Sequence, residues 1–188
     1  MKNLAIFASG TGSNAKKIIE YFHTNPYINV RLVLSNKKDA PVLNIAQEND
    51  IETIVINRRD FYETEQLLAD LQNRAIDLIV LAGFLWFIPD YLVKAFDRRI
   101  INIHPALLPK YGGKGMYGMR VHEAVKAADE RESGITIHYV NEHYDKGDII
   151  FQEKCVLEPN DTSEDIAHKV QALEHKHFAK VIEKLLQA

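Results

Sequence analysis

Short apolar runs alternate with helix-like stretches through the first hundred residues, and this alternation limits the folds open to the chain. Strands that alternate with helices predict a parallel, doubly wound α/β sheet with right-handed crossovers. The expected strands are 4–8, 30–35, 53–56, 78–82 and 100–103, and the expected helices are 15–22, 42–49, 61–74 and 91–96.

The last third of the chain has a different pattern. Two strand-like runs, 134–140 and 149–156, are joined by a polar stretch, so we expect an antiparallel pair added late to the sheet. A closing helix follows, which Asp161 or Thr162 can cap. Its predicted apolar stripe is Ile166, Val170, Leu173, Phe178, Val181 and Leu185. A length of 188 residues with 46% hydrophobic content suits one domain, residues 1–188.

The charge and composition of the chain limit the classes of molecule that we expect it to bind and the compartment in which we expect it. A formal net charge of −3 argues against a nucleic-acid surface, and separate basic doublets such as Lys37-Lys38 are expected on a solvated surface. No apolar run has the length of a membrane span or of a signal peptide, so we expect a cytoplasmic protein. Cys155 is the single cysteine, which excludes an intrachain disulfide and predicts a buried, inert thiol.

One expected strand is followed at once by an amide, an imidazole and two prolines, in the run Asn-Ile-His-Pro-Ala-Leu-Leu-Pro (102–109). On an extended segment Asn102 and His104 leave the same face. An amide can hydrogen-bond a carbonyl oxygen as negative charge develops there, and an imidazole can move a proton near neutral pH. Pro105 should end the strand. The run therefore predicts acyl-transfer chemistry.

Two earlier segments should meet this run, because ligands of such sheets bind beyond the carboxyl ends of the strands. The glycine turn 9–14 offers backbone N–H groups that suit an anion. Without the third glycine of a dinucleotide fingerprint or the lysine of a Walker A loop, it fits a phosphate monoester best. A plain turn with Ser13 as a helix cap is the alternative. Segment 83–89 is apolar and aromatic, which suits either ordinary core or a wall against a flat heterocycle.

Two later polar segments also leave alternatives open. The glycine-rich stretch 110–118 could be a lid over a ligand or a plain surface loop. The turn 141–148 could be a solvated hairpin or could supply a carboxylate that orients His104. His168 and His175 share a helix face but lie about two turns, ~10 Å, apart, too far to bind one metal. No HExxH-like cluster occurs, so we expect no metal site.

With these segments in this order, the chain resembles the folate-dependent phosphoribosylglycinamide formyltransferase family over nearly its whole length. The run 102–109 is specific to the folate formyltransferase superfamily, while the turn 9–14 and the segment 171–175 narrow it to the glycinamide branch. The resemblance implies a Rossmann-like formyltransferase fold. It also implies formyl transfer from 10-formyltetrahydrofolate, a cosubstrate, to the amine of 5'-phosphoribosylglycinamide in purine biosynthesis. The implied partners are these small molecules, and the assembly is a monomer or homodimer.

The resemblance assigns roles to individual residues. Asn102 and His104 match the catalytic amide and imidazole, and Asp145 matches the acid that tunes the histidine. His104 is expected to be cationic, with support from Asp145. The residues that match the ribotide site are Gly12, Ser13, Asn14, Gln171 and Glu174. The residues that match the folate site are Leu85, Trp86, Phe87, Ile88, Asn102 and the loop Asn141, Glu142, His143, Tyr144 and Asp145. His122 and His138 match histidines near the site, with secondary roles expected.

Three departures from the family pattern stand out. Trp86 occupies a position where many relatives have arginine, and no arginine lies near Glu63 and Thr64, where some relatives contact folate. The glutamate tail of the cofactor is therefore expected to be held differently. The loop through 112–118 is longer than in many relatives, so contacts there are not carried over.

Three rival functions share part of this pattern. A formyltetrahydrofolate hydrolase usually has a regulatory domain ahead of the sheet, whereas here the first strand begins near residue 4. A methionyl-tRNA formyltransferase usually has an added RNA-binding domain, for which we find neither length nor positive charge. A non-catalytic folate- or phosphate-binding module would not need Asn102, His104 and Asp145 together.

Overall fold

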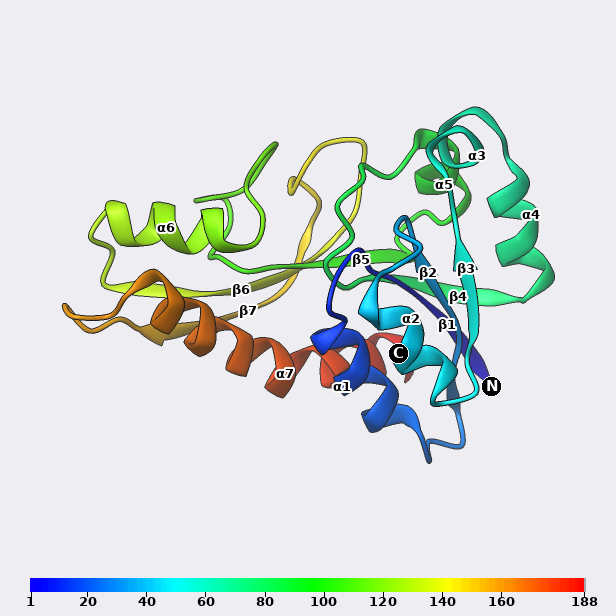
Figure 1. The fold of residues 1–188 in the computed structure, drawn as a ribbon, viewed down its shortest axis with the longest axis horizontal. Helices are drawn as coiled ribbons and strands as arrows, with labels where there is room; N and C mark the ends of the chain where they lie inside the picture. The colour runs from blue at the N-terminus through cyan, green and yellow to red at the C-terminus, as the bar shows by residue number, and fades with distance from the viewer. Residues whose placement is uncertain (188) are drawn as a thin grey trace.

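A computed structural model describes residues 1–187 and contains a seven-stranded sheet in the order β3-β2-β1-β4-β5-β6-β7 (Figure 1). The strands are β1 (Lys2–Phe7), β2 (Ile28–Ser35), β3 (Glu52–Val55), β4 (Ile76–Leu81), β5 (Ile100–His104), β6 (Glu132–Tyr139) and β7 (Ile149–Val156). The pairs among β1 to β5 are parallel, whereas β5–β6 and β6–β7 are antiparallel. These pairings confirm the predicted doubly wound sheet with late antiparallel strands.

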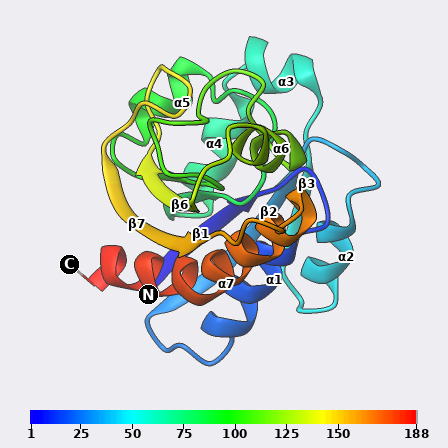
Figure 2. The same ribbon diagram turned by 90° about the vertical axis from the view of Figure 1, so that its left-hand side faces the viewer.

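The helices cover both faces of this sheet. They are α1 (Ser13–Phe22), α2 (Pro41–Gln47), α3 (Arg58–Glu63), α4 (Gln66–Asn73), α5 (Asp90–Ala95), α6 (Met119–Ala127) and α7 (Ser163–Gln187). Figure 2 shows α1, α2 and α7 on one side of the strands and α3, α4 and α5 on the other. Among the helices of residues 1–187, none combines the length and apolar composition needed to cross a bilayer.

The alternation of side chains along β1 explains why both faces are covered. Leu4 and Ile6 pack into the core with α1, α2 and α7, while Ala5 and Phe7 pack into the core with α3, α4 and α5. All four are fully buried. A parallel strand that is buried on both faces reads as an unbroken apolar run, which is how β1 appears in the sequence.

The helices differ from the sequence prediction in two places. The single helix expected over 61–74 is two helices, because Thr64 adopts extended backbone (φ −131°, ψ 161°) and its hydroxyl donates to the Asp60 carbonyl. Helix α6 was not predicted. Its buried residues Val121, His122 and Val125 follow a glycine-rich stretch, which obscures a short amphipathic pattern.

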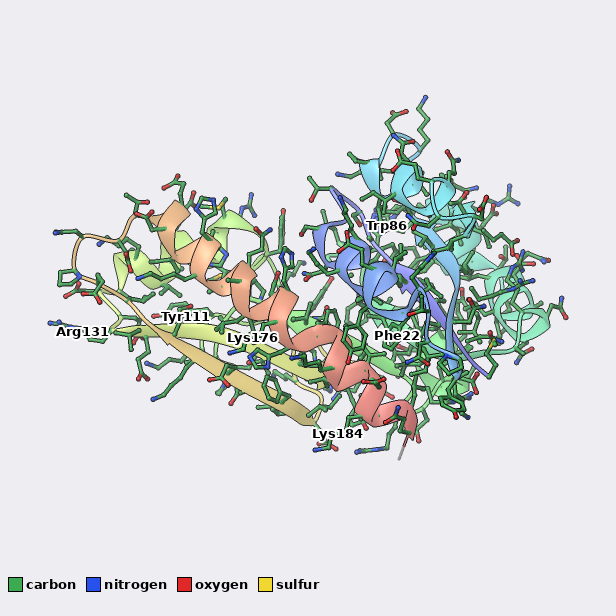
Figure 3. All side chains as sticks on the ribbon, turned by 90° about the horizontal axis from the view of Figure 1, so that it is seen from below. Phe22, Trp86, Tyr111, Arg131, Lys176 and Lys184 are labelled. Carbon is green, nitrogen blue, oxygen red and sulfur yellow. The ribbon has the colours of Figure 1, made fainter. Side chains whose placement is uncertain are left out.

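The closing helix α7 has the predicted cap and stripe. The Thr162 hydroxyl accepts a hydrogen bond from the Asp165 amide at 3.1 Å, and the Asp165 carboxylate accepts one from the Thr162 amide at 2.9 Å. In the predicted stripe, the fully buried residues are Ile166, Val170 and Phe178, and the partly buried residues are Leu173, Val181 and Leu185. In Figure 3, α7 crosses one face diagonally with Lys176 and Lys184 along it.

Candidate active site

A cavity of about 800 Å³ lies beyond the carboxyl ends of β1, β4 and β5. The glycine turn, the aromatic segment and the β5 exit all line it, which confirms that the three segments converge. Ser9 joins two of them: its amide donates to the Gly83 carbonyl at 3.0 Å, and its hydroxyl accepts from the Leu85 amide at 2.9 Å. The volume falls in the range typical of small-molecule sites.

Most of the residues singled out in the sequence line this cavity. They are Gly12, Ser13, Asn14, Leu85, Trp86, Phe87, Ile88, Asn102, His104, Asn141, His143, Tyr144, Asp145, Gln171 and Glu174. Glu142 is exposed and does not line it, so the structure brings no support for its expected folate contact. Among residues 1–187, no group of three or more His, Cys, Asp or Glu side chains could hold a metal ion.

Strand β5 presents Asn102 and His104 to the cavity from one face. Asn102 is partly exposed, while His104 is 3% exposed. The strand ends at His104, as Pro105 predicts. The exit that follows is tied to β6, because the Thr136 hydroxyl donates to the Ala106 carbonyl at 2.7 Å and accepts from the Leu108 amide at 3.0 Å. This anchoring holds the imidazole in place.

Asp145 is the acid that reaches the imidazole. Its Oδ2 lies 3.6 Å from Nδ1 of His104, and its Oδ1 lies 3.5 Å from Nε2 of His138. Asp148, the neighbouring candidate, instead forms an exposed ion pair with Arg98 at 2.7 Å. The polar turn therefore contributes a buried carboxylate to the cavity rather than a solvated hairpin alone.

Burial works against the charge on His104. Loss of hydration, the largest influence, lowers the pKa of His104, while the Asp145 carboxylate and the Tyr111 carbonyl oppose that shift only in part. Burial also raises the pKa of Asp145, but the His138 side chain beside it, the charge of His104 and the Gly113 amide outweigh this effect and leave the pKa lowered. The expectation of a cationic His104 considered the carboxylate and missed the desolvation.

The glycine-rich stretch 110–118 closes over this cluster. The Tyr111 carbonyl accepts a hydrogen bond from Nε2 of His104 at 2.7 Å. The Gly113 amide donates to Oδ2 of Asp145 at 2.8 Å. Gly113, Gly115 and neighbouring residues line the cavity, so the stretch forms part of the site's wall.

The glycine turn and α7 form the other end of the cavity. Gly12 has a left-handed backbone (φ 76°) and precedes α1, so it occupies the capping position that the plain-turn alternative gave to Ser13. The Asn14 side-chain amide donates to the Glu174 carboxylate at 2.8 Å, and Gln171 donates to the Ser13 hydroxyl at 3.4 Å. Burial raises the pKa of Glu174, and the bond from Asn14 opposes this. Asn14 Oδ1 is buried without a partner among residues 1–187.

The aromatic segment is partly core and partly wall. The Trp86 ring, labelled in Figure 3, packs against the rings of Phe61 and Tyr62, with distances between ring centroids of 5.5 Å and 6.0 Å. The Phe87 ring lies 4.5 Å from the Tyr144 ring at the rim of the cavity. Part of this segment is therefore core and part lines the cavity, and its role as a wall against a flat heterocycle stays a prediction.

Sequence reasoning missed Lys37 at this site. It follows β2 and lines the cavity beside the glycine turn, while its side chain is exposed, as expected for this doublet. The Ser9 hydroxyl donates to Asn36 Oδ1 at 2.6 Å and so ties the end of β2 to the turn. The signal was available, because the carboxyl end of a second parallel strand reaches the same edge of the sheet.

Comparisons with known proteins agree with this geometry. The family model described as formyl transferase matches residues 2–182. The chloroplastic phosphoribosylglycinamide formyltransferase of Arabidopsis thaliana is 43% identical over 96% of this chain and 64% of its own length. The phosphoribosylglycinamide formyltransferase of Bacillus subtilis is 34% identical over 99% of this chain and 95% of its own length. The crystal structure of the Anaplasma phagocytophilum protein of that name superposes with a TM-score of 0.91 at 32% identity, covering 99% of this chain and 87% of that one.

The extent of these matches differs between relatives. The chain spans 64% and 61% of the two plant proteins, from Arabidopsis thaliana and Vigna unguiculata, which is less than two thirds of their length. It spans nearly all of the Bacillus subtilis protein. Because the family model matches almost every residue described, and a relative of similar length shares a third of its residues, the chain belongs to the formyl transferase family.

Proposed function

We propose that the chain transfers a formyl group from 10-formyltetrahydrofolate to the amine of 5'-phosphoribosylglycinamide, a step of de novo purine biosynthesis. The observation that carries the proposal is the placement of Asn102, His104 and Asp145 in one cavity, between an anion-suited turn and an apolar segment. The proposal treats residues 1–188 as one formyl-transfer domain, with both cores built on a single sheet. The curated relatives named above support the choice of substrates.

The ribotide fits the end of the cavity formed by the glycine turn and α7. The start of α1 offers backbone N–H groups to a phosphate, and Lys37 supplies a positive charge beside it. Lys37 forms no ion pair within residues 1–187. Glu174 and the unpartnered Asn14 Oδ1 provide acceptors for hydroxyl or amine groups.

The folate fits the other end. Leu85 to Ile88 offer an apolar wall for a flat ring, and Tyr144 closes the rim. When bound, 10-formyltetrahydrofolate supplies the formyl carbon that the ribotide amine attacks. The loop from Asn141 to Asp145 touches this wall through Tyr144 and the catalytic cluster through Asp145, so it can close around the bound ring.

Asn102 is proposed to stabilise developing charge, and His104 to move a proton. The Asn102 amide can donate to the formyl oxygen as negative charge develops there. Neutral His104 donates from Nε2 to Tyr111, which leaves Nδ1 free to take up a proton beside the Asp145 carboxylate. His104 can thus hold the proton that leaves the amine and return it toward the departing folate nitrogen. No nucleophilic side chain is required.

An acceptor assay tests the proposal directly. Purified protein is given 10-formyltetrahydrofolate with the ribotide, with water alone or with methionyl-tRNA, and formyl products are counted. We expect rapid transfer to the ribotide and slow loss to water. Inorganic phosphate should compete with the ribotide and not with the folate. Equal rates with and without ribotide would identify a hydrolase instead, and transfer to the tRNA would identify a different acceptor.

Location and partners extend the proposal. We propose a cytoplasmic enzyme that acts on small molecules, without a nucleic-acid partner, as a monomer or homodimer. The negative net charge of the chain supports the absence of a nucleic-acid surface.

A further inference from the structure

A second histidine faces the catalytic amide from the next strand. His138 on β6 lies directly opposite Asn102 in the register of β5 and β6 and is 2% exposed. Its ring nitrogens have different partners. Nδ1 lies 2.8 Å from the carbonyl oxygen of Tyr139, and Nε2 lies 3.2 Å from Nδ2 of Asn102.

These two contacts fix the protonation of the ring. A carbonyl oxygen can only accept, so Nδ1 of His138 must carry a hydrogen. An amide nitrogen can only donate, so Nε2 must present a bare lone pair to Asn102. A neutral ring with its hydrogen on Nδ1 satisfies both. If the Asn102 amide were reversed, its oxygen would face that lone pair, so the ring also determines which end of the amide points toward it.

The same ring lies beside the acid of the site. The two oxygens of Asp145 face Nε2 of His138 at 3.5 Å and Nδ1 of His104 at 3.6 Å. One carboxylate therefore faces a nitrogen of each imidazole. On His138 the lone pair of Nε2 is occupied by the Asn102 N–H, whereas Nδ1 of His104 has no such donor.

We propose that His138 is a positioning residue, which holds the Asn102 amide in one orientation. The proposal rests on the proposed function for its kinetic consequences and on the contacts above for its structural ones. Because His138 acts through Asn102 and not on substrate binding, its loss should lower kcat and leave both KM values nearly unchanged.

Nitrogen-15 NMR of the ring tests the structural half without any assay of activity. In protein labelled at histidine and asparagine, we expect His138 to be neutral with hydrogen on Nδ1 at neutral pH. A scalar coupling or cross-peak should connect Nε2 to the Asn102 side-chain amide. A ring with hydrogen on Nε2, or a cationic ring, would overturn the proposal even if the enzyme transfers formyl groups as proposed.

Paired variants test the kinetic half. His138→Phe keeps the ring bulk and removes the acceptor, and we expect kcat to fall about 10-fold to 100-fold, as for a misplaced catalytic group. His138→Gln retains an oxygen that can accept the Asn102 N–H and should recover most of that loss. Ser133→Ala, a buried hydroxyl on the same strand with no partner among residues 1–187, serves as the folding control and should keep wild-type kcat.

Each outcome separates the two proposals. A wild-type protein that makes no formylated ribotide contradicts the proposed function, while the NMR result still decides the His138–Asn102 contact. An active wild type whose His138→Phe variant folds and keeps its kcat contradicts the positioning role. If His138→Phe does not fold, the glutamine variant and the NMR spectrum remain decisive: a glutamine variant with kcat reduced as far as Asn102→Ala would refute rescue by the acceptor.

Discussion

Asn102 is partly exposed on β5, with one amide hydrogen given to His138, so its removal tests the proposed chemistry at a single residue. Asn102→Ala should fold normally and lose kcat by about 10²-fold to 10³-fold, as for loss of one oxyanion donor. Steady-state kinetics with thermal unfolding of the same sample measure both. Near-wild-type turnover in a folded variant would remove Asn102 from the mechanism.

The carboxylate beside His104 can be identified by its effect on titration. The charge of Asp145 raises the pKa of His104 against the lowering caused by burial, so Asp145→Asn should lower it further. The limb of the pH–rate profile that belongs to His104 should move to lower pH, and an NMR titration of the ring reports the same shift. Asp148→Asn is the matched control, since Asp148 pairs with Arg98 at the surface. A larger response in the control would show that Asp148 is the partner.

At the residue scale, spacing predicted part of the site. Asn102 and His104 two apart on a strand sufficed to place them on one face. The choice of Asp145 over Asp148 needed the family resemblance, because both acids lie in one polar turn. The hydrogen bond between His104 and the Tyr111 carbonyl depends on how the glycine-rich stretch folds back over β5, and no spacing rule predicts it.

The glycine turn is the element whose geometry most restricts substitution. A Cβ at Gly12 would combine a left-handed backbone with a 2.6 Å approach to Cγ2 of Val42 on α2. Gly12→Ala should therefore lower the free energy of unfolding by about 1–3 kcal/mol and weaken ribotide binding as α1 shifts. Gly10→Ala is the control in the same turn, because no atom lies within 4 Å of its added Cβ. Denaturant unfolding of the pair decides, and equal losses would contradict the argument.

At the scale of helices and strands, some features are not predicted by sequence patterns. The positions of β1, β2, β4 and β5 followed from apolar runs, because these parallel strands are largely buried on both faces. The break at Thr64 depends on a hydroxyl that bonds the preceding turn, and the pattern alone gave a continuous helix. Helix α6 was overlooked because it is short and begins at Met119, directly after glycines.

Across the whole molecule, four histidines resist protonation. Burial is the largest influence in each case and lowers the pKa of His104, His122, His175 and His177 from the ordinary value of 6.5. Below pH 6.5 these histidines bind more protons in the unfolded chain than in the folded one. Their contribution to the free energy of unfolding is therefore complete above pH 6.5 and is lost as pH falls toward the folded pKa values. The melting temperature should therefore decrease from neutral pH to about pH 5.

One carboxyl acts in the opposite sense and one histidine supplies a control. The pKa of Glu174 is raised by burial, so its protonation favours the folded state as pH falls and offsets part of the loss. His177, stacked on Phe151 at 5.0 Å, lies outside the cavity. His177→Gln should reduce the slope of melting temperature against pH and leave kcat unchanged. A melting temperature that rises on acidification would contradict the prediction.

The hydrogen bond between Asn14 and Glu174 joins residues 160 positions apart, and α7 lies against α1 to make it. The proposed ribotide end of the cavity is therefore incomplete in a nascent polypeptide until α7 has been synthesised. All seven strands precede α7 in the chain, so the whole sheet is synthesised before this wall of the site. The free energy of ribotide binding can accordingly stabilise the fold only after α7 has packed against α1.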